Sequence, residues 1–359
     1  VDALGSQASD VRTERVMAGS APATWVDVPG VRHERVVLYL HGGAFVAETP
    51  RFHGALLARI CREAGVRGLM PCYRLAPEHR YPAALDDCIG AYCWLLAQGF
   101  EAGRIIVAGD SAGGNLTLAL LLRAREEGLP LPAGAVALSP VADLTFSGDS
   151  IRRNDGIDDM FSADLMDALV PVYLARPELR HHPHVSPVFG DCTGMPPLLL
   201  IVGSTELLLD DSVRVAHRCP SAQLLVWNGM PHVFPGFGFL PEARAATRRI
   251  VLFMRECLDG APAPQAAVQA QEDRTATPLE AKAEGEGEPR RLDAVAWLYL
   301  ALTVLTGSVS LASLALIAQT PARFLAALLP VAGFGLFLVL FLRRARQGLL
   351  RPVNGPSAR

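Results

Sequence analysis

The sequence predicts an α/β domain in which helices cover both faces of a mainly parallel β-sheet. Short apolar runs that suit buried strands alternate with longer helix-like stretches over residues 1–260. Strands that alternate with helices form βαβ units, and such units build parallel sheets. The predicted strands lie at residues 36–40, 105–108, 135–138, 198–202 and 224–227. The predicted helices lie at residues 53–64, 82–98, 112–127, 208–219 and 241–257.

Length and composition narrow the function classes. The chain has 359 residues and a formal net charge of −3, which leaves room for one large domain plus extra material. No basic patch stands out in residues 1–260, so nucleic acid is not expected as a partner. The seven cysteines are scattered and lack C-x-x-C spacing, which predicts free thiols in a reducing compartment rather than a disulfide framework or a zinc site. The first residues show no secretory signal pattern.

Composition changes sharply after Gly260. Residues 261–292 are rich in Ala, Pro, Glu and Gln, and predict a disordered linker. Residues 294–318 and 324–342 contain no charged side chain, and as helices they would span roughly 37 and 28 Å against a hydrocarbon core of about 30 Å. We therefore predict a transmembrane helical hairpin at 293–343. A buried hairpin of a soluble domain is the alternative, but nothing nearby would cover both helices.

Positive charges on the flanks of the hairpin predict its orientation. Arg290 and Arg291 precede the first span, whereas the loop between the spans holds only Arg323. The second span is followed by Arg343, Arg344 and Arg346. The positive-inside rule then places both outer flanks in the cytoplasm. The sequence predicts a protein of the cytoplasmic membrane, with residues 1–260 facing the cytoplasm and 344–359 as a basic cytoplasmic tail.

A candidate nucleophile lies between a predicted strand and a predicted helix. Gly109-Asp110-Ser111-Ala112-Gly113 fits the pattern G-x-S-x-G, and strand, sharp turn and helix are the context that this pattern requires. Small residues let the backbone turn tightly and leave the hydroxyl of Ser111 accessible. The alternative is a glycine-rich turn that only packs.

A second glycine-containing turn, His41-Gly42-Gly43-Ala44, follows the predicted strand at 36–40. Adjacent glycines allow backbone amides to face a ligand, and acyl transfer needs such amides to stabilise the oxyanion of its tetrahedral intermediate. We predict that the amides of Gly42 and Gly43, with that of Ala112, form this oxyanion hole. His41 is expected to hold the loop in shape.

A serine hydroxyl needs an adjacent base, and the base needs an orienting acid. His232 follows the last predicted strand, in the loop Gly229-Met230-Pro231-His232-Val233-Phe234, and is the predicted base. Glu206 lies nearest to the end of the strand at 198–202 and is the predicted acid. Asp210 and Asp211 are the alternatives, although we expect them to flank the next helix.

Residues 150–185 break the alternation of strands and helices and are expected to form part of a lid over the site. This segment holds His181, His182 and His184, which suggest either a metal site or a solvated loop. No acidic or cysteine partner stands at ligand spacing, so we favour the loop. No metal and no organic cofactor is predicted.

Taken together, these motifs resemble the hormone-sensitive-lipase-like family of α/β-hydrolase-fold esterases over roughly residues 15–258. The matching segments are His41-Gly42-Gly43-Ala44-Phe45, Tyr73-Arg74-Leu75-Ala76-Pro77-Glu78, Gly109-Asp110-Ser111-Ala112-Gly113-Gly114 and the loop that holds His232. The resemblance implies an α/β-hydrolase fold and hydrolysis of short- to medium-chain carboxylic esters through an acyl-enzyme.

The chain departs from the family pattern in three ways. Glu206 stands where the family usually has Asp, so the neighbouring loop must accommodate a longer side chain. Only 40 residues precede His41, where the family has a longer part of its helical cap, so we expect either a truncated chain or a small cap over a more open acyl pocket. The hairpin is no part of the family's core.

Two functions are compatible with this pattern. The first is a membrane-tethered serine ester hydrolase whose partners are an ester substrate and the bilayer. The second is a catalytically weak ligand-binding protein that retains the hydrolase fold. The presence of both Ser111 and His232 favours the enzyme. Neither the natural substrate nor the oligomeric state is predicted.

Overall fold

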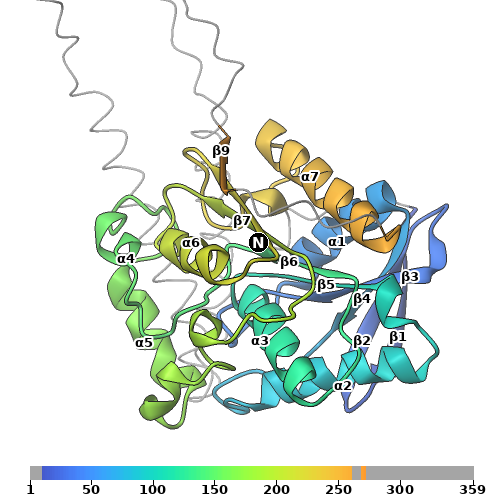
Figure 1. The fold of residues 1–359 in the computed structure, drawn as a ribbon, viewed down its shortest axis with the longest axis horizontal. Helices are drawn as coiled ribbons and strands as arrows, with labels where there is room; N and C mark the ends of the chain where they lie inside the picture. Colours follow the sequence, from blue (N-terminus) through green and yellow to red (C-terminus); the bar gives the residue numbers. More distant parts are fainter. Residues whose placement is uncertain (1–9, 261–267, 272–359) are drawn as a thin grey trace, which may run out of the picture. The chain divides into compact units, whose positions relative to one another are not determined.

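The computed structural model describes residues 10–260 and 268–271, and the structural statements below concern these residues. They form a nine-stranded sheet in the order β1-β2-β4-β3-β5-β6-β7-β8-β9 (Figure 1). The strands are β1 (Arg12–Ala18), β2 (Ala21–Asp27), β3 (Arg32–Leu40), β4 (Val66–Pro71), β5 (Ile105–Asp110), β6 (Gly134–Leu138), β7 (Leu198–Gly203), β8 (Ala222–Trp227) and β9 (Val268–Gln271).

The central and C-terminal part of the sheet is parallel, as predicted. Strands β4, β3, β5, β6, β7, β8 and β9 pair in parallel, whereas β1 and β2 form an antiparallel hairpin whose second strand pairs antiparallel with β4. All five predicted strands are present. Strands β1, β2 and β4 were not predicted, because β1 is largely exposed, Pro22 and Thr24 interrupt β2, and β4 carries a charge and a proline, so none gives a continuous apolar run.

Helices cover both faces of the sheet, which confirms the predicted architecture. Along β3, Val36, Leu38 and Leu40 pack with α2 (Ala83–Ala97) and α3 (Ala112–Glu126). Val37 and Tyr39 pack with α1 (Pro50–Ala64) and α7 (Pro241–Leu258) on the other face, as the alternation of strand side chains requires. Figure 1 shows α1 and α7 together on one side of the sheet. The helices that correspond to predictions are α1 (Pro50–Ala64), α2 (Ala83–Ala97), α3 (Ala112–Glu126), α6 (Leu209–Arg218) and α7 (Pro241–Leu258).

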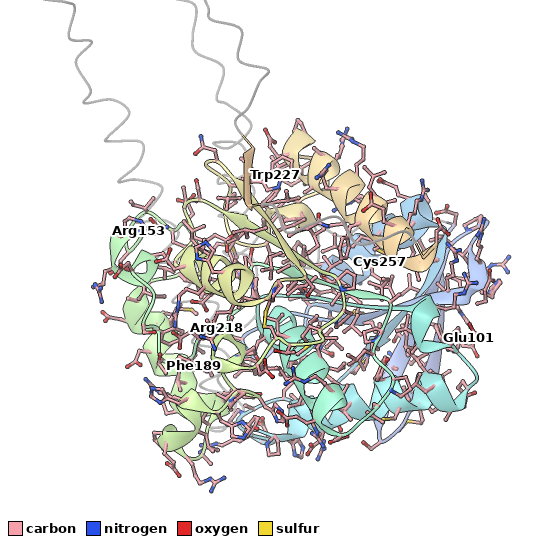
Figure 2. The ribbon with its side chains drawn as sticks, in the orientation of Figure 1. Glu101, Arg153, Phe189, Arg218, Trp227 and Cys257 are labelled. Carbon is pink, nitrogen blue, oxygen red and sulfur yellow. A yellow bond between two sulfur atoms is a disulfide. The ribbon has the colours of Figure 1, made fainter. Side chains whose placement is uncertain are left out.

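The irregular segment predicted at 150–185 lies between β6 and β7 and forms one flank of the domain (Figure 2, label Arg153). It contains the helices α4 (Ser150–Arg153) and α5 (Ala163–Tyr173) and the 3₁₀ turn η3 (Pro177–His181). The hydroxyl of Ser162 accepts a hydrogen bond from the Leu165 amide and so caps the start of α5. Three further 3₁₀ turns are η2 (Ala102–Arg104), η4 (Pro187–Phe189) and η5 (Phe234–Gly236).

The predicted hairpin at 293–343 and the tail at 344–359 lie outside the described residues. Within the part of the chain that is described, no helix is both long and apolar enough to cross a bilayer. Strand β9 falls inside the segment 261–292, where a linker is predicted; the rest of that segment also lies outside the described residues.

The cysteine prediction was wrong for one pair, because Cys192 and Cys219 form a disulfide. Cys192 precedes β7 and Cys219 follows α6, so the pairing of β7 with β8 brings these distant positions together. Spacing along the chain carries no sign of such a contact. Cys61, Cys72, Cys88, Cys93 and Cys257 are free thiols.

Candidate active site

Ser111 occupies the sharp turn between β5 and α3. Its backbone has φ 54° and ψ −118°, a conformation that is strained for a residue with a side chain and is typical of a nucleophile elbow. The surrounding glycines are required by close approach: a Cβ on Gly109 would lie 2.3 Å from the Gly113 carbonyl oxygen, and one on Gly113 would lie 1.9 Å from that of Leu40. The predicted nucleophile therefore lies where the motif places it.

His232 and Glu206 are brought together as predicted. The Nδ1 atom of His232 lies 2.9 Å from Oε2 of Glu206, and the two side chains are 3% and 0% exposed. Burial alone would lower the pKa of His232, but the hydrogen bond and the charge of Glu206 raise it above its ordinary value. The Nε2 atom of the same ring is buried and has no hydrogen-bond partner among the described residues. This ring is thus oriented by its acid and has one nitrogen left to exchange a proton.

The carboxylate of Glu206 is fixed by two further donors. Its Oε1 atom accepts the Gly203 amide and the hydroxyl of Ser139, the latter at 2.8 Å. The same hydroxyl accepts the Val233 amide at 3.1 Å. Ser139 therefore connects the acid to the loop that carries His232.

The alternative acids hold the neighbouring segment in place. Asp210 and Asp211 lie in the first turn of α6, as expected. The carboxylate of Asp210 accepts the Ser150 amide, and that of Asp211 accepts the amides of Ala142 and Asp143. Neither is paired with His232.

The prediction for Gly42 needs correction. Its amide donates to Oδ1 of Asp110 at 3.1 Å and is therefore not available to a substrate. The amides of Gly43 and Ala112 have no acceptor in the described part of the chain, and neither has that of Ala44. Ala44 lines the same pocket as Ser111. The free donors are therefore shifted by one residue along the loop from the predicted pair.

His41 holds this loop, as predicted. Its Nδ1 atom lies 2.7 Å from the Gly42 carbonyl oxygen, and its ring stacks on that of Tyr73 with the centroids 4.1 Å apart. Burial lowers the pKa of His41 to about 4, so the ring is neutral near pH 7. A neutral ring whose nitrogen is bonded to the loop backbone suits a structural role.

An apolar pocket lies beside Ser111. Much of its wall comes from the segment between β6 and β7. Phe161 is part of that wall and also contacts the ring of His232 edge-on, with the centroids 4.9 Å apart. Side chains that line the pocket include Phe45, Val141, Leu144, Phe146, Met166, Leu169, Val170, Tyr173 and Leu208.

Several polar residues to which the sequence motifs give no role support this site. Asp158 accepts the amides of Met160, Phe161 and Leu207, and so ties the pocket wall to the acid loop. Asp110 and Ser139 make the contacts described above. Of these residues, Asp110 lies within the G-x-S-x-G pattern, at a position that this pattern leaves unspecified.

The fold and the site together define an α/β hydrolase. A parallel sheet carries a strained serine turn at the end of β5, and an acid and a histidine follow later in the chain at the ends of β7 and β8. The protein family described as alpha/beta hydrolase fold matches residues 37–236, which is more than half of the chain.

Known proteins specify the branch of this fold. An acetyl-hydrolase from Streptomyces hygroscopicus is 38% identical over 257 residues, which cover 70% of this chain and 84% of the relative. An esterase from Acinetobacter venetianus is 36% identical over 242 residues, or 64% and 80% of the two chains. The crystal structure of an esterase from the bacterial hormone-sensitive lipase family has a TM-score of 0.69 and 41% identity, and covers 71% of this chain and 88% of its own. The chain belongs to this hormone-sensitive-lipase-like family of α/β-hydrolase-fold esterases.

Proposed function

We propose that the chain is a serine hydrolase that cleaves short- to medium-chain carboxylic esters through an acyl-enzyme formed on Ser111. The observation that carries this proposal is the buried Glu206–His232 pair, whose second ring nitrogen has no partner among the described residues. Phe161 contacts the ring of this base and lines the pocket that Ser111 also lines, and a base near a serine on a strained turn is what nucleophilic catalysis by a hydroxyl requires. The family to which the chain belongs supports the same activity.

In the acylation step, Nε2 of His232 takes the proton of the Ser111 hydroxyl as its oxygen attacks the ester carbonyl. Glu206 stabilises the imidazolium that forms and keeps Nδ1 protonated. The amides of Gly43, Ala44 and Ala112 stabilise the oxyanion of the tetrahedral intermediate. The intermediate collapses when its carbon–oxygen bond to the alcohol breaks and His232 returns the proton to the leaving oxygen. Water then repeats the sequence on the acyl-enzyme and releases the acid.

The apolar pocket beside Ser111 supports an acyl group without charge. Its wall is built almost entirely from aliphatic and aromatic side chains, so a carboxylate or ammonium group on the acyl chain would lose its hydration without a charged partner. We therefore propose simple aliphatic acyl groups as the substrate class.

Hydrolysis of p-nitrophenyl acetate and butyrate by the purified full chain tests the proposal. Ser111→Ala is expected to lower the rate by about 10⁴-fold or more. A variant that kept the wild-type rate would rule out Ser111 as the nucleophile. A fluorophosphonate probe adds a second readout, since only an activated serine reacts quickly. Absence of labelling together with absence of turnover would favour the catalytically weak ligand-binding protein.

We also propose that a hairpin at 293–343 tethers the chain to the cytoplasmic membrane with the catalytic domain in the cytoplasm. Two uncharged runs of helix-spanning length and their arginine flanks support this. Fractionation of the full chain and of residues 1–260 tests it, since only the full chain should sediment with membranes. The side of the membrane on which the catalytic domain lies needs a test of its own, because the domain contains the Cys192–Cys219 disulfide and disulfides persist mainly in oxidising compartments. Protection of the domain from protease in intact spheroplasts would support the cytoplasmic side, and digestion would contradict it.

A further inference from the structure

A second buried cluster lies behind the serine turn and centres on the carboxylate of Asp110. Its Oδ1 atom accepts the hydroxyl of Tyr39 at 2.7 Å and the amide of Gly42 at 3.1 Å, and its Oδ2 atom lies 3.3 Å from Nε2 of His53. The side chains of Asp110 and His53 are only 3% and 4% exposed. The carboxylate thus joins the strand before the nucleophile, the oxyanion loop and the first turn of α1.

His53 is held from both sides. While Nε2 faces Asp110, Nδ1 lies 3.1 Å from both the carbonyl oxygen and the hydroxyl of Thr49 at the start of α1. Both ring nitrogens are therefore occupied, so this histidine has no free nitrogen to exchange a proton with a substrate. Its contacts suit a group that fixes the position of its neighbours.

Asp110 occupies a place where a small displacement has consequences for the site. It is the last residue of β5 and directly precedes Ser111, whereas Gly42 directly precedes the free amides of the oxyanion loop. A rotation of this carboxylate would move the loop amides relative to the serine. Transition-state stabilisation depends on donors placed within a few tenths of an ångström.

We propose that His53 is a positioning residue of the hydrolytic site, which holds the carboxylate of Asp110 so that Gly42 and the oxyanion loop keep their register with Ser111. This inference rests on the proposed function and deepens it, since it assigns a remote side chain to the alignment of the oxyanion hole. His53 touches no reacting atom.

The charges around the pair agree with this role. Burial alone would raise the pKa of Asp110, but the charge and hydrogen bond of His53 lower it below its ordinary value. Burial would lower the pKa of His53, but Asp110 raises it. Titratable and charged groups that face His53, or line the cavity it borders, are Asp110 on β5, Tyr39 on β3, His41 just after β3, Glu48 before α1, and Arg15 and Cys72 at the cavity wall.

The test compares His53→Phe with His53→Gln in the full chain, with p-nitrophenyl butyrate as substrate. Phenylalanine keeps a flat ring among Tyr39 and Phe52 but donates no hydrogen bond, whereas glutamine retains an N–H donor of similar reach. We expect His53→Phe to lower kcat by about 10- to 100-fold with KM unchanged within about twofold, and His53→Gln to restore most of the loss.

Two readouts separate positioning from a general loss of structure. The inhibition constant of butylboronic acid, which binds serine as a tetrahedral adduct, should weaken in His53→Phe by the same factor as kcat. The pH profile of kcat should also gain an ionisation on its acid side, because Asp110 without His53 is protonated at higher pH. His217→Gln, an exposed histidine on α6, is the matched control and should leave both readouts unchanged.

Wild-type kcat and boronate affinity in His53→Phe would overturn the inference. Equal losses of kcat in His53→Phe and His53→Gln, with an unchanged pH profile, would also overturn the inference, because they would show that His53 acts through packing alone. If His53→Phe does not fold, Tyr39→Phe gives the answer, because it removes one donor to Asp110 and keeps the ring. A roughly threefold or larger fall in kcat and boronate affinity would support the inference, and no fall would overturn it. Loss of turnover in Ser111→Ala tests the proposed function separately from any of these results.

Discussion

His232 and His53 are both buried and both paired with a carboxylate, yet they present opposite ring nitrogens to it. His232 uses Nδ1 for Glu206 and leaves Nε2 without a partner among the described residues, whereas His53 uses Nε2 for Asp110 and Nδ1 for Thr49. The carboxylates are alike, since in each one oxygen accepts two groups of the protein and the other faces the imidazole. In the mechanism proposed above, this difference in the second ring nitrogen makes His232 the proton carrier and His53 a support.

This comparison also shows why burial and a raised pKa do not by themselves identify a base. The pKa of both histidines is raised by the neighbouring carboxylate, against the effect of burial. Only geometry distinguishes the two histidines. The ring of His232 contacts Phe161 of the pocket wall and has one nitrogen without a partner among the described residues. Both nitrogens of His53 have partners, Asp110 and Thr49.

The largest expected effect separates the two histidines directly. His232→Gln should lower kcat/KM for p-nitrophenyl butyrate by about 10⁴-fold or more, because the serine loses its base. This exceeds the loss of about 10- to 100-fold expected for His53→Phe by at least two orders of magnitude. Steady-state kinetics with matched protein concentrations, and active-site titration to exclude contaminating enzyme, provide the measurement. Similar losses at both positions would show that the two pairs do not differ in role.

Stability is expected to depend on the Asp110 pair. Asp110→Ala should lower the free energy of unfolding by about 3–5 kcal/mol near neutral pH, because His53, Tyr39 and the Gly42 amide lose their buried partner. Urea denaturation followed by circular dichroism measures this change. Glu101→Ala, at an exposed position on the edge of the domain (Figure 2), should stay within about 0.5 kcal/mol of wild type. An equally small effect at Asp110 would contradict the structural role of the pair.

The directions in which the pKa values of His53 and Asp110 are shifted determine how the stability of the fold depends on pH. The pKa of His53 is raised, so its part of the stabilisation is complete below its ordinary value near 6.5 and is lost as pH rises through the raised value. The pKa of Asp110 is lowered, so its part is present above 3.8 and is lost as pH falls through the lowered value. The difference in the free energy of unfolding between wild type and Asp110→Ala should therefore be largest between about pH 3.8 and pH 6.5. Denaturation curves at several pH values measure this difference. A difference that stayed constant with pH would show that the pair is not charged.

The sequence predicted those parts of the fold that depend on local pattern. Continuous apolar runs identified β3, β5, β6, β7 and β8, because a strand buried on both faces is apolar at every position. The largely exposed β1 and the interrupted β4 have no such run. The same limit applies to Cys192 and Cys219, whose contact depends on how β7 and β8 pair.

The candidate site was predictable where a motif placed a residue at the end of a strand. Ser111, Glu206 and His232 each follow a predicted strand, so the topology of a parallel sheet brings them to one edge. The supporting residues gave no such signal. In the sequence, His53 and Asp110 are 57 residues apart, and Tyr39 and Asp110 are 71 residues apart. The bond between the Gly42 amide and Asp110 is also a contact between distant positions, so the sequence does not show that this amide is already occupied.

The pH dependence of activity sharpens the comparison on the side of His232. A base acts only in its neutral form, so kcat/KM should rise with pH through the raised pKa of His232. Glu206→Gln removes the charge that helps to raise this pKa and leaves only a neutral acceptor, so the acid limb of its profile should move to lower pH while the maximal rate falls. An acid limb that stayed in place would show that a different group controls it.

The smallest expected effect concerns Ser139, which supports the acid as His53 supports Asp110. Ser139→Ala removes the hydroxyl that donates to Glu206 and accepts the Val233 amide, while Gly203 and His232 still contact the carboxylate. Of these two bonds, the one to Glu206 supports the acid directly, and its loss is worth about 1 kcal/mol, so kcat should fall by roughly fivefold. Ser139→Cys would not repair it, since a thiol is a weak donor. We propose that His53 aligns the amides of the oxyanion loop, whereas Ser139 makes one of three contacts to the Glu206 carboxylate. The fall in kcat for Ser139→Ala should therefore be smaller than that for His53→Phe. The reverse order would mean that the position of Glu206, and not that of the oxyanion loop, limits the alignment of the site.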